Sequence, residues 1–259
     1  LSFFDMQGAG LGLYDGIIEY RLFNMSTAIY ALPFLLGVLF IFPALPPFKG
    51  YWRTLAWIAV ALSIVVLLIS GRRAFILVAL LSPFVVYGLL LMANIRVYVL
   101  KWMLVGSIVG VALMVVIIPI INLDFSLLWE NFISAFNYEN DTSSVSVRKG
   151  QFIALIDGWI NAPILGAGHG AAAEGVVRNH SQAWAYELSY VALLFQTGLV
   201  GILVYSSAIV WIFIKGISVM RRIPESAGLL VPTLSGLFCF LIVNATNPYL
   251  GSFDYLWVI

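Results

Sequence analysis

The chain has 259 residues, of which 62% are hydrophobic and only 10% are charged, and its formal net charge is +1. Its mean hydropathy is +1.03, whereas soluble domains carry about 25% charged residues. This composition excludes an ordinary soluble protein, and the near-zero net charge gives no indication of a nucleic-acid partner. The single cysteine, Cys239, excludes an intrachain disulfide and a cysteine-based metal cluster.

Hydropathy predicts an all-α, polytopic integral membrane helical bundle. A transmembrane helix needs about 20 apolar residues, and the segments that approach this length are 27–45, 51–70, 74–92, 102–121, 187–214 and 228–243. Residues 1–259 are therefore expected to form a single transmembrane domain of about six spans. The chain begins at Leu1 without a basic n-region or a cleavage site, so we expect an N-terminal part of the native protein to precede it.

Charge asymmetry orients the predicted spans. Alternating them across a bilayer gathers the cations of the short loops on one side, namely Lys49, Arg53, Arg96, Lys101, Lys215, Arg221 and Arg222. Cytoplasmic loops carry an excess of Lys and Arg, so this side is predicted to be cytoplasmic. The opposite side receives most of the acidic residues and a long polar loop at 122–186. Arg72 and Arg73 lie in an outer turn against this preference, which indicates that they have another purpose.

The loop at 122–186 contains a predicted amphipathic helix between Ser146 and Asn161. Its apolar residues recur at i, i+3, i+4 and i+7, which marks one helix face: Phe152, Leu155, Ile156 and Trp159. Its polar remainder consists of Arg148, Lys149, Gln151, Asp157 and Asn161. A short helix with Trp on its apolar side is suited to the membrane interface, and it could also cap the bundle. Pro163 is expected to end it.

A glycine-rich turn follows, Gly166-Ala167-Gly168-His169-Gly170. Its backbone N–H groups could approach an anion, or the turn could be a mobile hinge. His169 and His180 are the only histidines, and no third ligand stands at a spacing typical of metal sites. The sequence therefore predicts no metal site, and each histidine is either a solvated loop residue or a functional one.

The sharpest candidate site joins three outer arginines, Arg72, Arg73 and Arg148, with Glu187 at the mouth of a span. Ionisable residues at membrane depth usually face a cavity or a partner. The planar fork of arginine can grip phosphate oxygens in two places, and a carboxylate beside it can act as a general base toward a hydroxyl. The alternative is a structural Glu–Arg pair that closes the bundle. Lys149 and Arg178 are also consistent with interfacial or solvated charges.

Three stretches of the chain carry a family resemblance. Ile69-Ser70-Gly71-Arg72-Arg73-Ala74 is similar to an S-x-S-R-x-x turn between spans. Arg148, followed by Trp159, Pro163 and Gly166-Ala167-Gly168, is similar to an R…W…hP-hhG-h-G stretch. Glu187-Leu188-Ser189-Tyr190, followed by Gly198-Leu199-Val200-Gly201, is similar to an H-N-x-h-L…G-h-h-G helix start. In this order they resemble the C-terminal half of the bacterial O-antigen ligase and O-antigen polymerase superfamily, and the match covers most of the chain.

The resemblance implies a GT-C-like, metal-independent membrane glycosyltransferase without a cofactor, in the bacterial inner membrane. Such enzymes transfer a glycan from undecaprenyl pyrophosphate to a hydroxyl of a glycan acceptor at the periplasmic face. The implied partners are this lipid-linked donor, the glycan acceptor, membrane lipid and other polysaccharide-assembly proteins, with no nucleic acid. The implied catalytic residues are Glu187, His180 and Arg148, and the implied substrate-binding residues are Arg72, Arg73, Arg178, His169 and Tyr190.

One departure from the family pattern separates two activities. Counting back eleven residues from Gly198 reaches Glu187, where the ligases have a histidine. This favours an O-antigen-type polymerase over a ligase, with His180 as the second candidate base. A lipid-linked glycan transporter or flippase is the main alternative outside enzymes, although the sequence shows no internal repeat of the kind that transporters tend to have. A purely structural subunit would leave the outer arginine pair unexplained.

Overall fold

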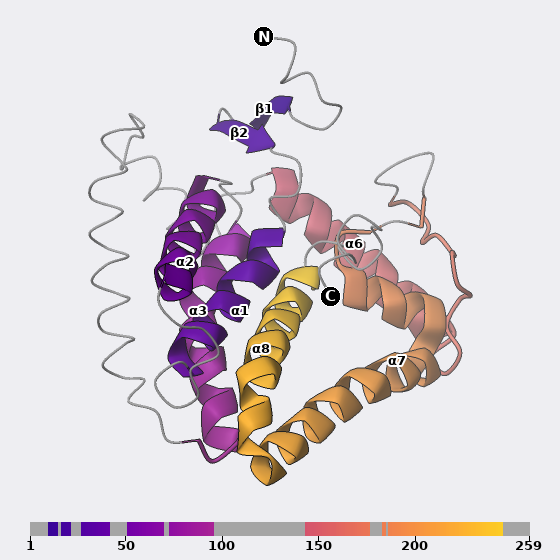
Figure 1. Cartoon of the computed structure of the whole chain (residues 1–259). Coiled ribbons are helices and arrows are strands. Elements are labelled where there is room, and N and C mark those ends of the chain that lie inside the picture. The colour runs from indigo at the N-terminus through magenta and orange to yellow at the C-terminus, as the bar shows by residue number, and fades with distance from the viewer. Residues whose placement is uncertain are drawn as a thin grey trace. The chain divides into compact units, whose positions relative to one another are not determined.

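The computed structural model describes residues 10–14, 17–21, 27–41, 51–69, 73–95, 143–176, 183–184 and 186–245. Most of these residues are helical (Figure 1). The helices are α1 (Thr27–Ile41), α2 (Tyr51–Ile69), α3 (Arg73–Met92), α6 (Ser143–Asn161), α7 (Ser189–Arg222) and α8 (Ala227–Asn244), with a short 3-10 turn at Pro224–Ser226. The predicted helical character is confirmed.

A two-stranded antiparallel hairpin precedes the helices, and the sequence analysis did not predict it. Strand β1 (Gly10–Tyr14) pairs with β2 (Ile17–Arg21), and Tyr14 stands opposite Ile17 at the closed end. Asp15-Gly16 separates the two strands in the sequence. Asp-Gly between short apolar runs is a strong signal for a tight hairpin turn, and this local signal could have identified the hairpin.

The predicted spans agree with the helices wherever the structure describes them. Helices α1, α2, α3 and α8 begin and end within four residues of the predicted segments, and α7 continues eight residues past the predicted end at 214. The predicted span at 102–121 lies outside the described residues. Within the described part of the chain, two helical segments are long and apolar enough to cross a membrane, Ser189–Arg222 with 34 residues and Pro224–Asn244 with 21. Length and composition thus indicate membrane association.

The chain divides into two compact units. The first comprises Leu1–Ile133, Gly216–Phe240 and Asp254–Ile259, and the second comprises Ser134–Lys215 and Leu241–Phe253. In the first unit α1 packs against α2 and α3, and it approaches α8 closely: a Cβ on Gly37 would lie 2.7 Å from Pro232 Cα. Small residues allow such close contact between apolar helices. Buried hydroxyl groups in this unit bond to their own helix, as Ser235 does to the Val231 carbonyl at 2.7 Å.

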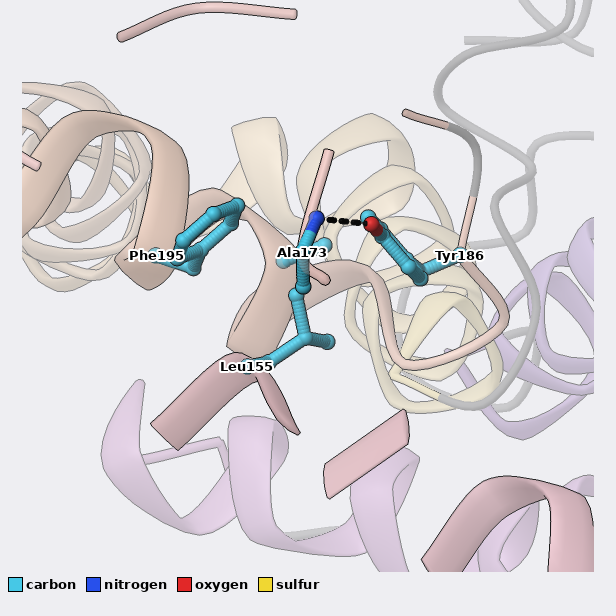
Figure 2. Close-up of a cluster of buried hydrophobic side chains, with 5 residues drawn as sticks. Leu155, Ala173, Tyr186 and Phe195 are labelled. Atoms are coloured by element: carbon cyan, nitrogen blue, oxygen red, sulfur yellow. Dashed lines mark hydrogen bonds between the residues drawn. The ribbon is translucent and has the colours of Figure 1, made fainter. Parts of the chain in front are cut away.

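The second unit carries the predicted interfacial helix and the start of α7. Its buried core consists of Leu155, Ala173, Tyr186, Ala192 and Phe195. Figure 2 shows the loop residue Ala173 between Phe195 of α7 and Tyr186, with Leu155 of α6 below it; the Ala173 N–H donates to the Tyr186 hydroxyl at 2.6 Å. This core ties α6, the loop and α7 into one body.

The buried face of α6 differs from the predicted one. Leu155 is fully buried, but Phe152, predicted to share its apolar face, is 49% exposed, and Gln151, which belongs to the predicted polar remainder, is fully buried. The reason is the position of α7, because a Cβ on Gly158 would lie 2.5 Å from the Phe195 ring. The face that meets α7 therefore runs through Gln151, Leu155 and Gly158.

Candidate functional site

Two of the predicted catalytic residues meet in the second unit. Arg148 lies in the second turn of α6, and Glu187 lies two residues before α7 begins. Arg148 Nε donates to Glu187 Oε2 at 2.7 Å, across 39 residues of sequence. The side chains remain 37% and 19% exposed, respectively. The ion pair is therefore partly open to solvent, as a site that receives a substrate must be.

Gln151 fixes the backbone of Glu187 as Arg148 fixes its carboxylate. The N–H of Glu187 donates to Gln151 Oε1 at 3.1 Å. Arg148 and Gln151 are three residues apart and share one face of α6. Glu187 is thus held to a single helix at both its backbone and its side chain. The sequence analysis did not select Gln151, although its i+3 spacing from Arg148 was a signal that could have done so.

Helix α7 is broken at Gly198, its tenth residue. Gly198 has φ 62° and ψ −167°, which lie outside the helical region. The loop after α6 pairs with both sides of this break. Ala167 N–H donates to the Phe195 carbonyl at 2.8 Å, and Gly168 N–H to the Gln196 carbonyl at 3.0 Å. In the other direction, Leu199 N–H donates to the Pro163 carbonyl at 3.0 Å. The loop therefore replaces the hydrogen bonds that the broken helix turn lacks.

The same contacts define the glycine-rich turn. Gly166, Gly168 and Gly170 have positive φ values of 74°, 107° and 85°. Gly166 N–H donates to the Ala162 carbonyl at 2.9 Å, so the N–H groups of residues 166–168 all have backbone acceptors. These three N–H groups therefore form hydrogen bonds within the chain, and the bonds of Ala167 and Gly168 anchor the turn to α7. Anion binding by their N–H groups would require those bonds to break.

The remaining predicted site residues have different environments. His169 is exposed on the glycine-rich turn. Tyr190 donates its hydroxyl to the Leu241 carbonyl at 2.6 Å, a contact within the second unit that engages the group predicted to bind substrate. Arg73 begins α3, in the first unit. Its side chain lies outside the described part of the structure, as do Arg72, Arg178 and His180.

Among the described residues, no group of three His, Cys, Asp or Glu side chains is arranged to hold a metal ion. The described site presents a carboxylate, a guanidinium and an amide. No protein-family model, curated protein or solved structure matches this chain. The family resemblance consequently rests on its motifs alone, and the function is argued from the site.

Proposed function

We propose that this chain is a membrane glycosyltransferase that polymerises surface-polysaccharide repeat units carried on undecaprenyl pyrophosphate. The observation that carries the proposal is the Arg148–Glu187 pair, with its 2.7 Å contact and partial exposure. A carboxylate in this position can accept a proton, and a guanidinium beside it can bind a phosphate oxygen. These are the two functions that a transfer from a lipid diphosphate to a hydroxyl requires.

In the proposed reaction, Glu187 acts as the general base. The carboxylate takes the proton of the acceptor hydroxyl while the hydroxyl oxygen forms a bond to the anomeric carbon of the donor. The bond between that carbon and the diphosphate oxygen breaks, and undecaprenyl pyrophosphate leaves with the electron pair. The proton on Glu187 then passes to water. A positioned general base typically contributes about 10²–10⁴-fold to the rate.

Arg148 links the base to the leaving group. Its Nε is engaged with Glu187, so its two Nη nitrogens are the groups that can bind diphosphate oxygens. Negative charge grows on the leaving group as the bond breaks, and a cation held in place stabilises it electrostatically. One guanidinium thus orients the carboxylate and stabilises the diphosphate. Arg72 and Arg73 belong to the first unit, and their part in binding the diphosphate stays a prediction from their motif.

The surface of α6 supports a location at the membrane interface. Its exposed apolar side chains include Phe152, Ile153 and Ile160, and the polar residues Asp157 and Asn161 are exposed on the same helix. Such a helix is suited to lying in the plane of the headgroups. The proposed site would then stand at the depth of a lipid diphosphate, on the side of the inner membrane that we propose to be periplasmic.

A transporter is the second candidate, because a discontinuous helix such as α7 is common in transporter sites. The polar groups at this break, however, pair with residues 163–168. Non-helical backbone whose polar groups pair with protein in this way is tolerated at membrane depth without a water-filled cavity. The Arg148–Glu187 pair, whose carboxylate stands eleven residues before the break in the sequence, favours transfer chemistry over transport.

The proposal is tested with the glycan ladder of cells that carry Glu187→Gln, which keeps the shape of the side chain and removes its charge. Loss of the ladder, with single repeats still attached to their final acceptor, is expected for a polymerase. Loss of all attachment, with long chains on the lipid carrier, would identify a ligase. Glu174→Gln is the matched control, because Glu174 is exposed in the same loop. An unchanged ladder in Glu187→Gln cells would overturn the role of Glu187.

A further inference from the structure

Two buried polar atoms beside Glu187 have unused hydrogen-bonding capacity. Among the described residues, the buried side-chain nitrogen or oxygen atoms without a hydrogen-bond partner are Gln151 Nε2 and Ser189 Oγ. Both residues bond to the backbone of Glu187, since Gln151 accepts from its N–H and Ser189 N–H donates to its carbonyl at 3.0 Å. Buried polar groups are nearly always paired, so each exception needs an explanation. The exceptions here stand at the proposed base.

The orientation of the Gln151 amide follows from its contact with Glu187. A backbone N–H is a donor, so its partner on Gln151 must be the carbonyl oxygen. The amide nitrogen then points away from that contact, with two N–H groups to donate. Gln151 is fully buried, one helical turn from Arg148. An unpaired amide N–H in such a place is costly unless another group accepts from it.

The chemistry around this nitrogen fits a sugar hydroxyl. The amide N–H can only donate and an ionised carboxylate can only accept, whereas a hydroxyl does both. Nε2 is a neutral donor, whereas the guanidinium of Arg148 provides the charge-assisted donors that suit a diphosphate oxygen. The combination of Gln151 and Glu187 therefore matches a neutral, hydroxylated ligand.

We propose that Gln151 binds the acceptor: its Nε2 donates a hydrogen bond to a hydroxyl oxygen of the acceptor sugar beside Glu187. This inference rests on the proposed polymerase function. It assigns Gln151, which has no role in the proposed reaction, to a hydroxyl group of the acceptor sugar. Because the nitrogen is buried, the groups that cover it must move aside as the acceptor enters, as in sites that close around their substrates. Ser189 Oγ is available as a second contact to the same sugar.

The test compares the binding of two probes to the intact protein in nanodiscs, measured by thermal stabilisation. One probe is undecaprenyl pyrophosphate, and the other is the soluble repeat-unit oligosaccharide released from the host's own surface glycan. Gln151→Met should weaken oligosaccharide binding about three- to tenfold, the usual effect of one neutral hydrogen bond, and leave undecaprenyl pyrophosphate binding unchanged. The control is Asn161→Leu, which removes an exposed amide that bonds the Asp157 carbonyl of its own helix. It should bind both probes like the wild type.

Every other outcome of the binding test has a single interpretation. A wild-type protein that binds neither probe contradicts the proposed function itself. Equal oligosaccharide binding by the wild type and Gln151→Met leaves the function standing and overturns the role of Gln151, and loss of both probes shows a structural role and overturns it as well. If Gln151→Met does not fold, Gln151→Glu replaces it, because this variant keeps an oxygen acceptor for the Glu187 N–H and removes the amide donor. Undiminished oligosaccharide binding by Gln151→Glu would again overturn the proposal.

Discussion

Arg148 is an orienting residue as well as a cation. Its Nε bonds to Glu187, and the proposed mechanism assigns its Nη nitrogens to the diphosphate; this division of roles depends on the planar guanidinium. A lysine at this position has one charged nitrogen, which cannot hold the carboxylate and a phosphate in the same geometry. The conservative substitution is therefore expected to be as harmful as a truncation.

We predict that Arg148→Lys lowers the rate of glycan transfer about 10²-fold or more, the usual loss for a removed electrostatic donor, and that Arg148→Ala does no worse. Initial rates with purified protein measure this. Lys149→Ala is the matched control, because Lys149 is the exposed neighbour on the same helix, and its rate should stay near that of the wild type. Full activity of Arg148→Lys would show that only the positive charge matters.

The second candidate base, His180, lies outside the described residues, so its position relative to Arg148 rests on sequence alone. Glu187 has an observed partner in Arg148 and an observed anchor in Gln151. We therefore predict that His180→Ala shortens the glycan ladder less than Glu187→Gln does, when the two variants are expressed at equal levels. A ladder lost in His180→Ala and kept in Glu187→Gln would transfer the role of base to His180.

At the scale of the elements, the break in α7 explains two glycines of the family-like motif. A Cβ on Gly198 would collide with the Ile164 carbonyl oxygen, and one on Gly166 would lie 2.5 Å from the Gln196 backbone. Both positions also have positive φ, which a side chain disfavours by about 1–2 kcal/mol. These glycines let the loop after α6 and the break in α7 approach each other closely.

We predict that Gly198→Ala destabilises the protein by about 2 kcal/mol or more, because the strain and the collision add. For a domain of this size, the corresponding decrease in Tm is roughly 4–8 °C. Gly150→Ala is the control, because Gly150 is helical and a Cβ there meets nothing within 4 Å. Alanine has the higher helix propensity, so this variant should be at least as stable as the wild type. An unchanged Tm in Gly198→Ala would contradict the described break.

The same elements show how far the sequence could predict the structure. Apolar length determines a span, so the ends of α1, α2, α3 and α8 were accessible from hydropathy. Periodicity located α6 and two residues at its buried core, Leu155 and Trp159, but it missed Gln151 and Gly158, because their position depends on contact with α7, which leaves no trace in local spacing. The ion pair could be proposed from residue type and motif, whereas the role of Gln151 required knowing which face of α6 is buried.

At the scale of the whole molecule, orientation depends on the positive-inside rule. One contact in the first unit is consistent with it, since Arg221 Nε donates to the Met92 carbonyl at 2.7 Å and so brings the end of α7 to the end of α3. Both ends lie on the predicted cytoplasmic side. The loop at 122–186 is placed on the opposite side by the same rule.

We predict that a cysteine at Asp157 is labelled by an impermeant reagent from outside the inner membrane, and that a cysteine at Glu225 is labelled only after the membrane is opened. Both native residues are exposed, so each should react once the reagent has access. The native Cys239 is buried, and Cys239→Ala supplies the background. The reverse pattern would invert the topology and place the Arg148–Glu187 pair in the cytoplasm.

We propose that the Arg148–Glu187 pair catalyses glycan transfer from a lipid diphosphate. This catalysis is measured by the conversion of purified undecaprenyl-pyrophosphate-linked repeat units by the intact protein in liposomes, followed by product length and by released undecaprenyl pyrophosphate. With the wild type we expect longer glycans and one released carrier per bond formed. With Glu187→Gln, both products should decrease together by about 10²–10⁴-fold. Equal yields from the wild type and Glu187→Gln would show that Glu187 is not the catalytic base.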